Sequence, residues 1–392
     1  MIENTREYNP RLKFHKFKNI SWKKGILSNF ISIVTPKYKI QTDNYLQYGN
    51  IPIIDQSKKY ISGYTNDIKY IISNITPLII FGDHTCIIKI VHFKFAQGAD
   101  GIKIFYGNKN ISTEYIYQYL NHSPVIMEEY KRHFSILKDK VIYYPDDRQE
   151  QQKIADCLSS LDELIEAHEQ KLDTLQQYKK GLMQRLFPAE GKTIPHWRFP
   201  EFRNNGEWKN ISVSQLGKII TGKTPSTSNL SFWNGEYIWV TPTDITSHKY
   251  IYSSNRTVTS LWIKNNILPV NTVLITCIAS IGKNCILRKE GFCNQQINAI
   301  VPNLKNYDSS FIYYNFEKNE HILINNSGAS ATRILPKSKF EELHFLFPSL
   351  PEQQKIANCL TSLDERIEAQ EEKITALKEH KKGLMQQLFP SL

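Results

Sequence analysis

The chain has 392 residues, of which 41% are hydrophobic and 12% aromatic, and it carries a formal net charge of +11. At about 100–200 residues per domain this length favours two or three domains, and the apolar content excludes a disordered chain. Its apolar runs, such as Tyr70–Phe81, are too short and too polar to span a bilayer, and the first ten residues lack the apolar core of a signal peptide, so we expect a soluble cytoplasmic protein.

The basic charge is confined to two regions of the chain. Residues 1–147 carry 20 basic and 13 acidic side chains, and residues 189–350 carry 17 and 11. The segments 148–188 and 351–392 carry 6 and 7 each. We therefore expect a first domain (1–147), a central helix (148–188), a second domain (189–350) and a C-terminal helix (351–392).

The first region mixes short β-type runs with polar loops, and Thr113–Asn121 is typical of a helix. These patterns predict an α/β (α+β) globule. Lys and Arg neutralise phosphates, and polar or aromatic side chains contact bases, so basic loops are candidate DNA contacts. The candidates in this region are Lys58, Lys59, Tyr60 and Tyr64.

The central segment Glu150–Pro188 returns as Glu352–Pro390, with 27 identities in 39 aligned positions at an offset of 202. Ala, Leu, Glu, Gln and Lys dominate both copies, which predicts two long helices. Apolar residues recur every 3.5 residues on average, the period of a coiled-coil seam. The seam positions are Ile154, Leu158, Leu161, Ile165, Leu172 and Leu175, with Ile356, Leu360, Leu363, Ile367, Ile374 and Leu377 in the second copy.

Two packing partners are open for each helix: the other copy, antiparallel in the same chain, or a second chain. The near-identical repeats favour the first, an antiparallel intramolecular coiled coil in a pseudo-two-fold duplicated architecture. An intramolecular pair would be a rod of up to about 58 Å, or about 17 base pairs of DNA. Two seam positions in each copy are polar: His168, Lys179, Gln370 and Lys381. They either enforce the register from a buried position or lie at the solvated edge of the seam.

The second region has the same mixed character. Tyr237–Val240 reads as a strand after a turn at Trp233–Glu236, while Val273–Ile278 predicts a buried strand and Phe311–Asn319 a helix. Its candidate DNA contacts lie in the loop Lys223–Asn229 and the stretch 330–333. They are Lys223, Thr227, Asn229 and Arg333.

Catalytic motifs in the chain lack the context that their chemistry needs. Gly217–Thr224 fits the P-loop pattern, but a proline follows where a phosphate-binding helix should begin. Pro145-Asp146 with Glu169 and Lys171 mimics a nuclease set, but the last two lie in the heptad helix. Gly82-Asp83-His84 has no nucleophile nearby. We expect no catalytic residue in this chain.

Cysteine usage argues against a metal site or a disulfide framework. The six cysteines form no C-x-x-C pair, and no histidine cluster accompanies Cys277, Cys285 and Cys293. Small buried side chains on strands explain these three better. We therefore expect no bound metal.

Several phrases together resemble one family, the specificity (S) subunits of type I restriction–modification systems. The resemblance covers nearly the whole chain. It is carried by Glu150–Ala155, by Pro351–Ala357, and by the ending Lys-Lys-Gly-Leu-Met-Gln followed by Leu-Phe-Pro. Further matching phrases are 222–229, 232–235, 238–245, 279–283 and 294–300, with 81–86 and 98–101 as a variant core in the first region. Cys86 departs from the arginine that many relatives have there.

The resemblance implies the remaining expectations. Each variable region would be a target recognition domain that reads one half of a bipartite, asymmetric double-stranded DNA site, and the paired helices would set the spacer and dock two methyltransferase (M) subunits. S-adenosylmethionine, ATP and Mg would be bound by the M and restriction (R) subunits, with no cofactor on this chain. The alternatives are a coiled-coil adaptor without sequence-specific DNA binding and an ATP-dependent enzyme using Lys223.

Overall fold

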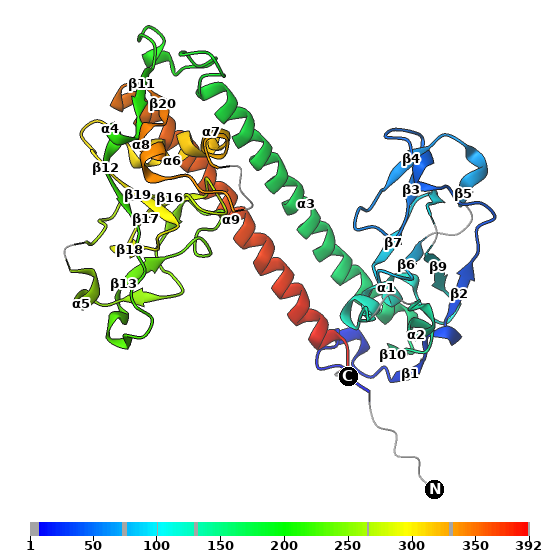
Figure 1. The fold of residues 1–392 in the computed structure, drawn as a ribbon. Helices are drawn as coiled ribbons and strands as arrows, with labels where there is room; N and C mark the ends of the chain where they lie inside the picture. The colour runs from blue at the N-terminus through cyan, green and yellow to red at the C-terminus, as the bar shows by residue number, and fades with distance from the viewer. Residues whose placement is uncertain are drawn as a thin grey trace. The chain divides into compact units, whose positions relative to one another are not determined.

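The computed structural model describes residues 8–72, 77–99, 101–128, 132–264, 266–328 and 332–390. They form two compact units: unit 1 comprises residues 1–169 and 373–392, and unit 2 comprises residues 170–372. Two long helices, α3 (Arg148–Leu186) and α9 (Leu350–Leu388), contribute one end to each unit (Figure 1). Each unit is therefore a globular region with the beginning of one long helix and the end of the other.

The globular region of unit 1 is built from small sheets. One has the strand order β2-β9-β6-β7 and a second β4-β3-β8-β5, while β1 pairs with β10. The strands are β1 (Trp22–Ile26), β2 (Ile31–Val34), β3 (Ile51–Ile54), β4 (Gly63–Thr65), β5 (Ile71–Ile72), β6 (Leu78–Gly82), β7 (Ile88–Val91), β8 (Phe95–Gln97), β9 (Ile102–Gly107) and β10 (Val141–Pro145). The helices are α1 (Thr113–His122) and α2 (Phe134–Lys138).

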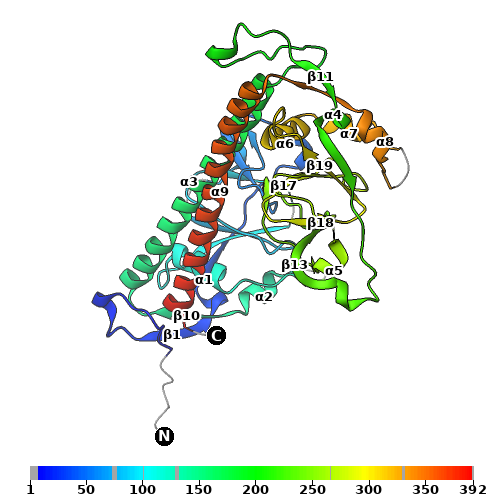
Figure 2. The ribbon, with the colours of Figure 1, turned by 90° about the vertical axis from the view of Figure 1, so that its left-hand side faces the viewer.

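Unit 2 contains the orders β12-β19-β16-β17-β14 and β15-β13-β18, with β11 paired to β20 (Figure 2). The strands are β11 (Lys209–Ser212), β12 (Gly217–Thr221), β13 (Trp233–Val240), β14 (Tyr250–Ile251), β15 (Thr257–Val258), β16 (Val273–Thr276), β17 (Asn284–Leu287), β18 (Gly291–Cys293), β19 (Ile297–Pro302) and β20 (His344–Phe347). The helices are α4 (Val213–Leu216), α5 (Ser260–Ile263), α6 (Ser309–Lys318), α7 (Glu320–Asn325) and α8 (Lys337–Glu342).

The two globular regions share most of their topology although their sequences diverge; only β5 of unit 1 and β14 of unit 2 lack a counterpart in the described sheets. β2-β9-β6-β7 and β12-β19-β16-β17 are antiparallel in the same order. In the second sheet of each unit, one parallel pair (β3 with β8, β13 with β18) joins one antiparallel pair (β3 with β4, β13 with β15). Strand for strand, the loop after β2 therefore corresponds to the loop after β12, and the β6–β7 turn to the β16–β17 turn.

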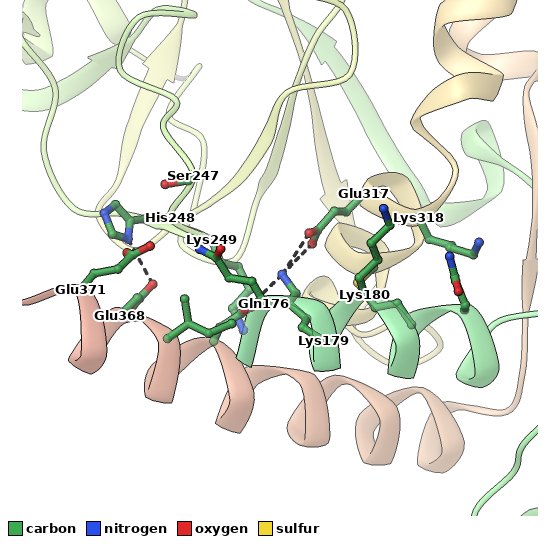
Figure 3. A pocket seen from close by; sticks show the side chains of 14 residues that line it. Gln176, Lys179, Lys180, Ser247, His248, Lys249, Glu317, Lys318, Glu368 and Glu371 are labelled. Carbon is green, nitrogen blue, oxygen red and sulfur yellow. Dashed lines mark hydrogen bonds and ion pairs between the residues drawn. The ribbon is translucent and has the colours of Figure 1, made fainter. Parts of the chain in front are cut away.

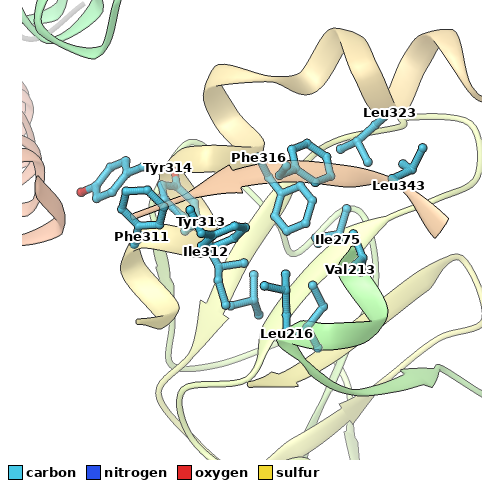
Figure 4. Packing of buried hydrophobic residues seen from close by; sticks show 14 of the residues in the cluster. Val213, Leu216, Ile275, Phe311, Ile312, Tyr313, Tyr314, Phe316, Leu323 and Leu343 are labelled. Atoms are coloured by element: carbon cyan, nitrogen blue, oxygen red, sulfur yellow. The ribbon is translucent and has the colours of Figure 1, made fainter. Parts of the chain in front are cut away.

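The central strands and the helix that covers them supply each core. β6 and β16 are buried along their whole length, as expected of apolar runs with sheet neighbours on both sides. Ser112 caps α1 and Asp308 caps α6, each accepting a backbone N–H from the first turn. In unit 2, aromatic residues of α6 pack on α4, β16 and β20 (Figure 4).

The first residues of each long helix fasten it to the globular region. The side chain of Gln151 accepts the backbone N–H of Ser112 at 2.8 Å, and that of Gln353 accepts the backbone N–H of Asp308 at 3.1 Å. The same two amides donate to the carbonyl of Pro145, the last residue of β10, and to that of Pro348, the residue after β20. Each long helix is thus locked to the N-cap of α1 or α6.

The glutamates before these glutamines are buried but have different partners. Glu352 accepts two hydrogen bonds of 2.8 Å from the guanidinium of Arg198. Glu150 accepts one of 3.3 Å from the indole of Trp22. Burial raises the pKa of Glu150, an effect that the hydrogen bond from Trp22 and the charge of Lys13 oppose.

The ends of α3 and α9 pair antiparallel within each unit, as predicted for an intramolecular coiled coil. In unit 1, Lys381 lies 2.5 Å from Asp162 and Lys378 lies 2.6 Å from Glu169. In unit 2, Lys179 lies 2.9 Å from Asp364. Since Lys381 and Lys179 are 202 residues apart, as are their partners, the register is the same in both units.

The predicted seam residues are all at least partly withdrawn from solvent. Ile154, Leu158, Ile165, Leu175, Ile356, Leu360, Leu363 and Ile374 are buried, and Leu161, Leu172, Ile367 and Leu377 are half-buried. Of the polar seam positions, Gln370 is buried, while the side chains of Lys179 and Lys381 are only 15% and 13% exposed. These lysines are therefore enclosed rather than solvated.

Most secondary-structure predictions are confirmed, with one correction. Thr113–Asn121 falls in α1, Phe311–Asn319 overlaps α6, and Val273–Ile278 contains β16. The predicted turn at Trp233–Glu236 is wrong, because β13 already begins at Trp233. A register shift between Trp233 and Tyr237 absorbs the Asn-Gly pair as a bulge in that strand.

Within the described ranges, no helix combines the length and the apolar character that a bilayer span requires.

Candidate nucleic-acid interface

A basic groove lies on the globular region of unit 1, where the loop after β2 passes the β6–β7 turn. It has a volume of about 420 Å³. Its cationic lining residues are Lys37, Lys39, Lys103 and Arg132, with His84 beside them. These come from the loop after β2, from β9, from the segment before α2 and from the β6–β7 turn. Four cations around one groove can neutralise several phosphates.

Asp83 is the acidic residue that lines this groove, and its carboxylate is used internally. It is 4% exposed and accepts the backbone N–H of Phe134 at 2.8 Å, while its carbonyl accepts the N–H of His133. Asp83 therefore holds the start of α2 against the β6–β7 turn. The Gly82-Asp83-His84 motif has this structural explanation, and the groove keeps its excess of positive charge.

Unit 2 presents cations at the corresponding places. Lys223 lies in the loop after β12, Lys283 at the end of the β16–β17 turn, and Arg333 beside that turn, where its carbonyl accepts the N–H of Ala279. All three side chains are exposed. Ser330, the first residue of the predicted stretch 330–333, lies outside the described residues.

The indoles of two tryptophans donate hydrogen bonds to backbone carbonyls of the loop after β12. The indole of Trp239 donates to the carbonyl of Lys223 at 3.0 Å, and that of Trp233 donates to the carbonyl of Ser226 at 3.1 Å. The guanidinium of Arg256 covers the ring of Trp233 at 3.4 Å from its centre. With its backbone fixed in this way, the loop can present Lys223 and the hydroxyl groups at its tip without reordering.

The predicted contacts in this loop have different surroundings. Thr227 is exposed at the tip. Asn229 is also exposed, but its side-chain oxygen accepts the N–H and the hydroxyl of Ser231, so it caps the short turn Leu230–Phe232. The structure thus brings Lys223 and Thr227 to one surface and gives Asn229 a local structural role.

The P-loop resemblance of 217–224 has no structural counterpart. Gly217–Thr221 is strand β12, and the next element is the three-residue turn Leu230–Phe232 rather than a helix. A Cβ on Gly222 would lie 2.0 Å from the carbonyl oxygen of Asn294. Close backbone packing therefore explains the glycine.

The predicted contacts of unit 1 lie on another part of its surface. Lys58, Lys59 and Tyr60 are exposed in the loop between β3 and β4, and Tyr64 is half-buried on β4. None of the four lines the basic groove. The hydroxyl of Tyr60 donates to the carbonyl of Ile90 at 2.6 Å.

Sequence reasoning therefore missed the groove of unit 1. Thr35-Pro36-Lys37 follows β2 as Gly222-Lys223-Thr224-Pro225 follows β12, and this shared pattern was the available signal. It becomes informative once β2 and β12 are known to be equivalent strands. Arg132 stands two residues before α2, and Arg333 stands four residues before α8.

The acidic residues of the nuclease-like pattern form ion pairs elsewhere in the structure. Asp146 pairs with Lys23 at 2.7 Å, and Glu169 pairs with Lys378 across the helices. In the part of the chain that is described, no group of acidic, histidine or cysteine side chains could hold a metal ion. Cys285 and Cys293 are buried on β17 and β18, as predicted for small strand residues. Cys277 is buried too, but it follows the end of β16, so its predicted place on a strand is wrong.

Another groove, of about 490 Å³, lies in unit 2 between its parts of the long helices and its globular region (Figure 3). Lys179 donates to Glu317 of α6 there, and His248 lies 3.3 Å from Glu368 of α9. Burial lowers the pKa of Lys179, but the charges of Glu317 and Asp364 together raise it by more, so the net shift of the pKa is upward. The mixed charges of this groove compensate one another, unlike those of the basic groove.

Comparisons with known proteins agree on one family. The model of the type I restriction modification DNA specificity domain matches residues 19–177 and 205–379. The MjaIX type I specificity subunit of Methanocaldococcus jannaschii is 33% identical over 169 residues, which are 41% of this chain and 39% of that protein. The EcoR124I/EcoR124II specificity subunit of Escherichia coli is 26% identical over 352 residues, 84% of this chain and 83% of that protein.

Solved structures show the same fold. The type I S subunit of M. genitalium matches with a TM-score of 0.70 at 16% identity and covers 98% of this chain and 100% of that one. A chain from a structure concerned with complex assembly and conformational transition of the type I R-M system matches with a TM-score of 0.53 at 13% identity, over 94% and 98% of the two chains.

Proposed function

The chain belongs to the type I restriction–modification DNA specificity family, and we propose that it reads a bipartite, asymmetric target in double-stranded DNA. It is a specificity subunit and not a catalytic one. The observation that carries the proposal is the repetition of one arrangement in both units. A cationic loop follows the first core strand (β2 or β12), and an arginine, Arg132 or Arg333, precedes the return to the long helix.

Divergent residues on a common scaffold suit the reading of two different half-sites. The loops after β2 and β12 differ in sequence, whereas the long helices α3 and α9 are near copies of each other. Differing side chains would contact different base edges, and the shared lysines would contact phosphate. We assign residues 1–147 and 189–350 to the two target recognition domains.

The repeated helices, 148–188 and 351–392, would separate the half-sites and dock two methyltransferase subunits. Near-identical helices suit identical partners. In this proposal S-adenosylmethionine, ATP and Mg belong to the methyltransferase and restriction subunits, which carry out adenine methylation and DNA cleavage. The complex would act in the cytoplasm, on the cell's own and on incoming DNA.

Sequencing the methylated adenines of a host that carries this chain with its partners tests the function directly. A two-part motif with a fixed spacer is the expected result. Binding of the assembled complex to that duplex, followed in increasing salt, then locates the contacts. Each lost phosphate contact lowers the slope of log affinity against log salt by about 0.9.

Two matched variants decide which loop of unit 1 contacts DNA. Replacing Lys37 and Lys39 by alanine should lower the salt slope by about 1.8, and Lys223→Ala by about 0.9 in unit 2. The control replaces Lys58 and Lys59, which carry the same charge on the other loop. A larger effect in the control would move the interface to the β3–β4 loop. Weak binding by the unmodified complex that ignores sequence would overturn the proposed function and favour an adaptor.

A further inference from the structure

A shared carboxylate lies on the coiled-coil seam of unit 1. Lys381 of α9 donates to Oδ1 of Asp162 on α3 at 2.5 Å. Gln118 of α1 donates to Oδ2 of the same carboxylate at 3.0 Å. Gln118 is fully buried, Lys381 is 13% exposed, and the Asp162 side chain between them is 39% exposed. Asp162 therefore ties the partner helix and the globular region to α3 at a single point.

Unit 2 repeats this junction with a different side chain from the globular region. Lys179 of α3 lies 2.9 Å from Oδ1 of Asp364 on α9, and the hydroxyl of Tyr314 on α6 donates to Oδ2 at 2.5 Å. Lys179 and Asp364 are 15% and 14% exposed. Lys179 also reaches Glu317 of α6, and Figure 3 shows these two side chains turned toward each other.

The two junctions are equivalent positions of the repeat. The aspartates are 202 residues apart, the lysines are 202 residues apart, and each domain donor stands six residues after the N-cap of its helix. The members are Asp162, Lys381 and Gln118 in unit 1 and Asp364, Lys179 and Tyr314 in unit 2. The helices kept the aspartate and the lysine while the domain donor changed, so the junction does not depend on one particular donor.

An apolar seam alone would leave the register loosely defined, because hydrophobic contact has no direction. An aspartate whose two oxygens bind different elements has a direction. Sliding one helix, or tilting the domain on the pair, would separate a mostly buried charge from its partner, which is costly. The junction therefore fixes helix register and domain seating together.

Domain seating bears on how DNA is read. Adding one base pair to a spacer moves a half-site by about 3.4 Å and turns it by about a tenth of a helical turn. A domain held rigidly on its helices cannot follow that movement, whereas a loosely seated domain can. Strict seating therefore translates into strict recognition of the spacer.

We propose that Asp162 and Asp364 are positioning residues that restrict the DNA spacer to one length. The inference rests on the proposed function, since a spacer exists only in a two-part target. Helix length would set the preferred spacer, and the two junctions would set how strictly it is enforced. Neither aspartate contacts DNA in this role.

The test uses the full chain assembled with its methyltransferase partners. Methylation rates are measured on duplexes with the preferred spacer and with spacers one base pair longer and shorter. The variant combines Gln118→Leu with Tyr314→Phe, which removes both domain donors and leaves the two ion pairs. Preference for the correct spacer should fall at least about tenfold, the cost of losing hydrogen bonds to charged groups. Preference for the correct half-sites should not change.

Tyr314→Phe alone provides a variant that removes one hydroxyl and leaves the core filled, should the double variant fail to fold. The matched control is Glu169→Ala with Lys378→Ala, an ion pair across the same helices whose side chains are 48% and 56% exposed. The control should keep the spacer preference.

Three results are separable. An unchanged spacer profile in the Tyr314→Phe chain, or an equal fall at every spacer, would overturn the inference. Loss of spacer preference in the exposed-pair control would overturn it too, because any break in the helix pair would then suffice. Absence of a two-part target for the unmodified chain would instead overturn the proposed function.

Discussion

Arg198 lies under the start of α9, and its replacement by alanine should destabilise unit 2 strongly. Its guanidinium donates twice to Glu352 at 2.8 Å and also to the carbonyls of Asn205 and Gly206 at 2.7 and 3.1 Å. The side chains of Arg198 and Glu352 are 7% and 1% exposed. The substitution therefore leaves a buried carboxylate without its counter-charge.

The size of the effect follows from that geometry. Removing one partner of a buried ion pair costs about 3–5 kcal/mol, because the remaining charge stays desolvated. Arg198→Lys keeps the charge but loses the two-pronged geometry, so its cost should be intermediate. The corresponding position of unit 1 is Lys13, which donates to the carbonyl of Ile20, while Glu150 takes its hydrogen bond from Trp22. Lys13→Ala should therefore cost only about 1 kcal/mol.

Urea unfolding of the full chain gives the two free energies, with hydrogen exchange to locate the loss. Exchange is needed because a chain with two units does not unfold as a single cooperative system. Faster exchange should appear in β11, β20 and the start of α9 for Arg198→Ala, and unit 1 should be unchanged. Equal costs for Arg198→Ala and Lys13→Ala would refute the reasoning, since burial and pairing would then not determine stability here.

Three further predictions concern the same elements. Burial raises the pKa of Glu150 above its ordinary value of 4.5, so its ionised form destabilises the fold at neutral pH, and this penalty is relieved as the pH falls through the folded-state pKa. Glu150→Gln should therefore raise the urea midpoint at pH 7 and abolish the gain in stability on acidification. Glu352→Gln should instead lower the midpoint, because it leaves the buried Arg198 without its counter-charge. Adding seven residues to both long helices should lengthen the preferred spacer by about 10.5 Å, or about three base pairs, without changing either half-site in the methylated motif; an unchanged spacer would exclude the helices as the ruler. Gly222→Ala should cost about 1–3 kcal/mol in thermal unfolding, because its Cβ would overlap the backbone of Asn294, and a variant as stable as the parent would show that the loop after β12 can move.

The long helices and the duplication could be predicted from the sequence because their signals are local. A 3.5-residue apolar period depends on residues a few positions apart, and a repeat is visible without any structure. The seam lysines were recognised as polar seam positions as well. Whether they are enclosed or solvated depends on Asp162 and Asp364, about 200 residues away, and only the packed helices show that they are enclosed.

The globular regions were harder to predict because strand pairing is non-local. β2 pairs with β9 across about 70 residues, with Val34 opposite Ile104, and sequence patterns do not reveal such partners. The common topology of the two regions was therefore hidden behind their divergent sequences. Without it, the loop after β2 cannot be matched to the loop after β12, and basic charge with tyrosines favours the β3–β4 loop of unit 1.

The duplication, the helical seam, the basic character of the two variable regions and the family resemblance all follow from the amino-acid sequence alone. The tertiary structure decided which cations share a groove, because Lys37, Lys103 and Arg132 become neighbours only through the pairing of β2 with β9 and the seating of α2 on Asp83. It also decided that each seam aspartate holds a helix and a domain together. Composition and period are properties of neighbours along the chain, whereas a binding surface and a junction are made by residues that folding brings together.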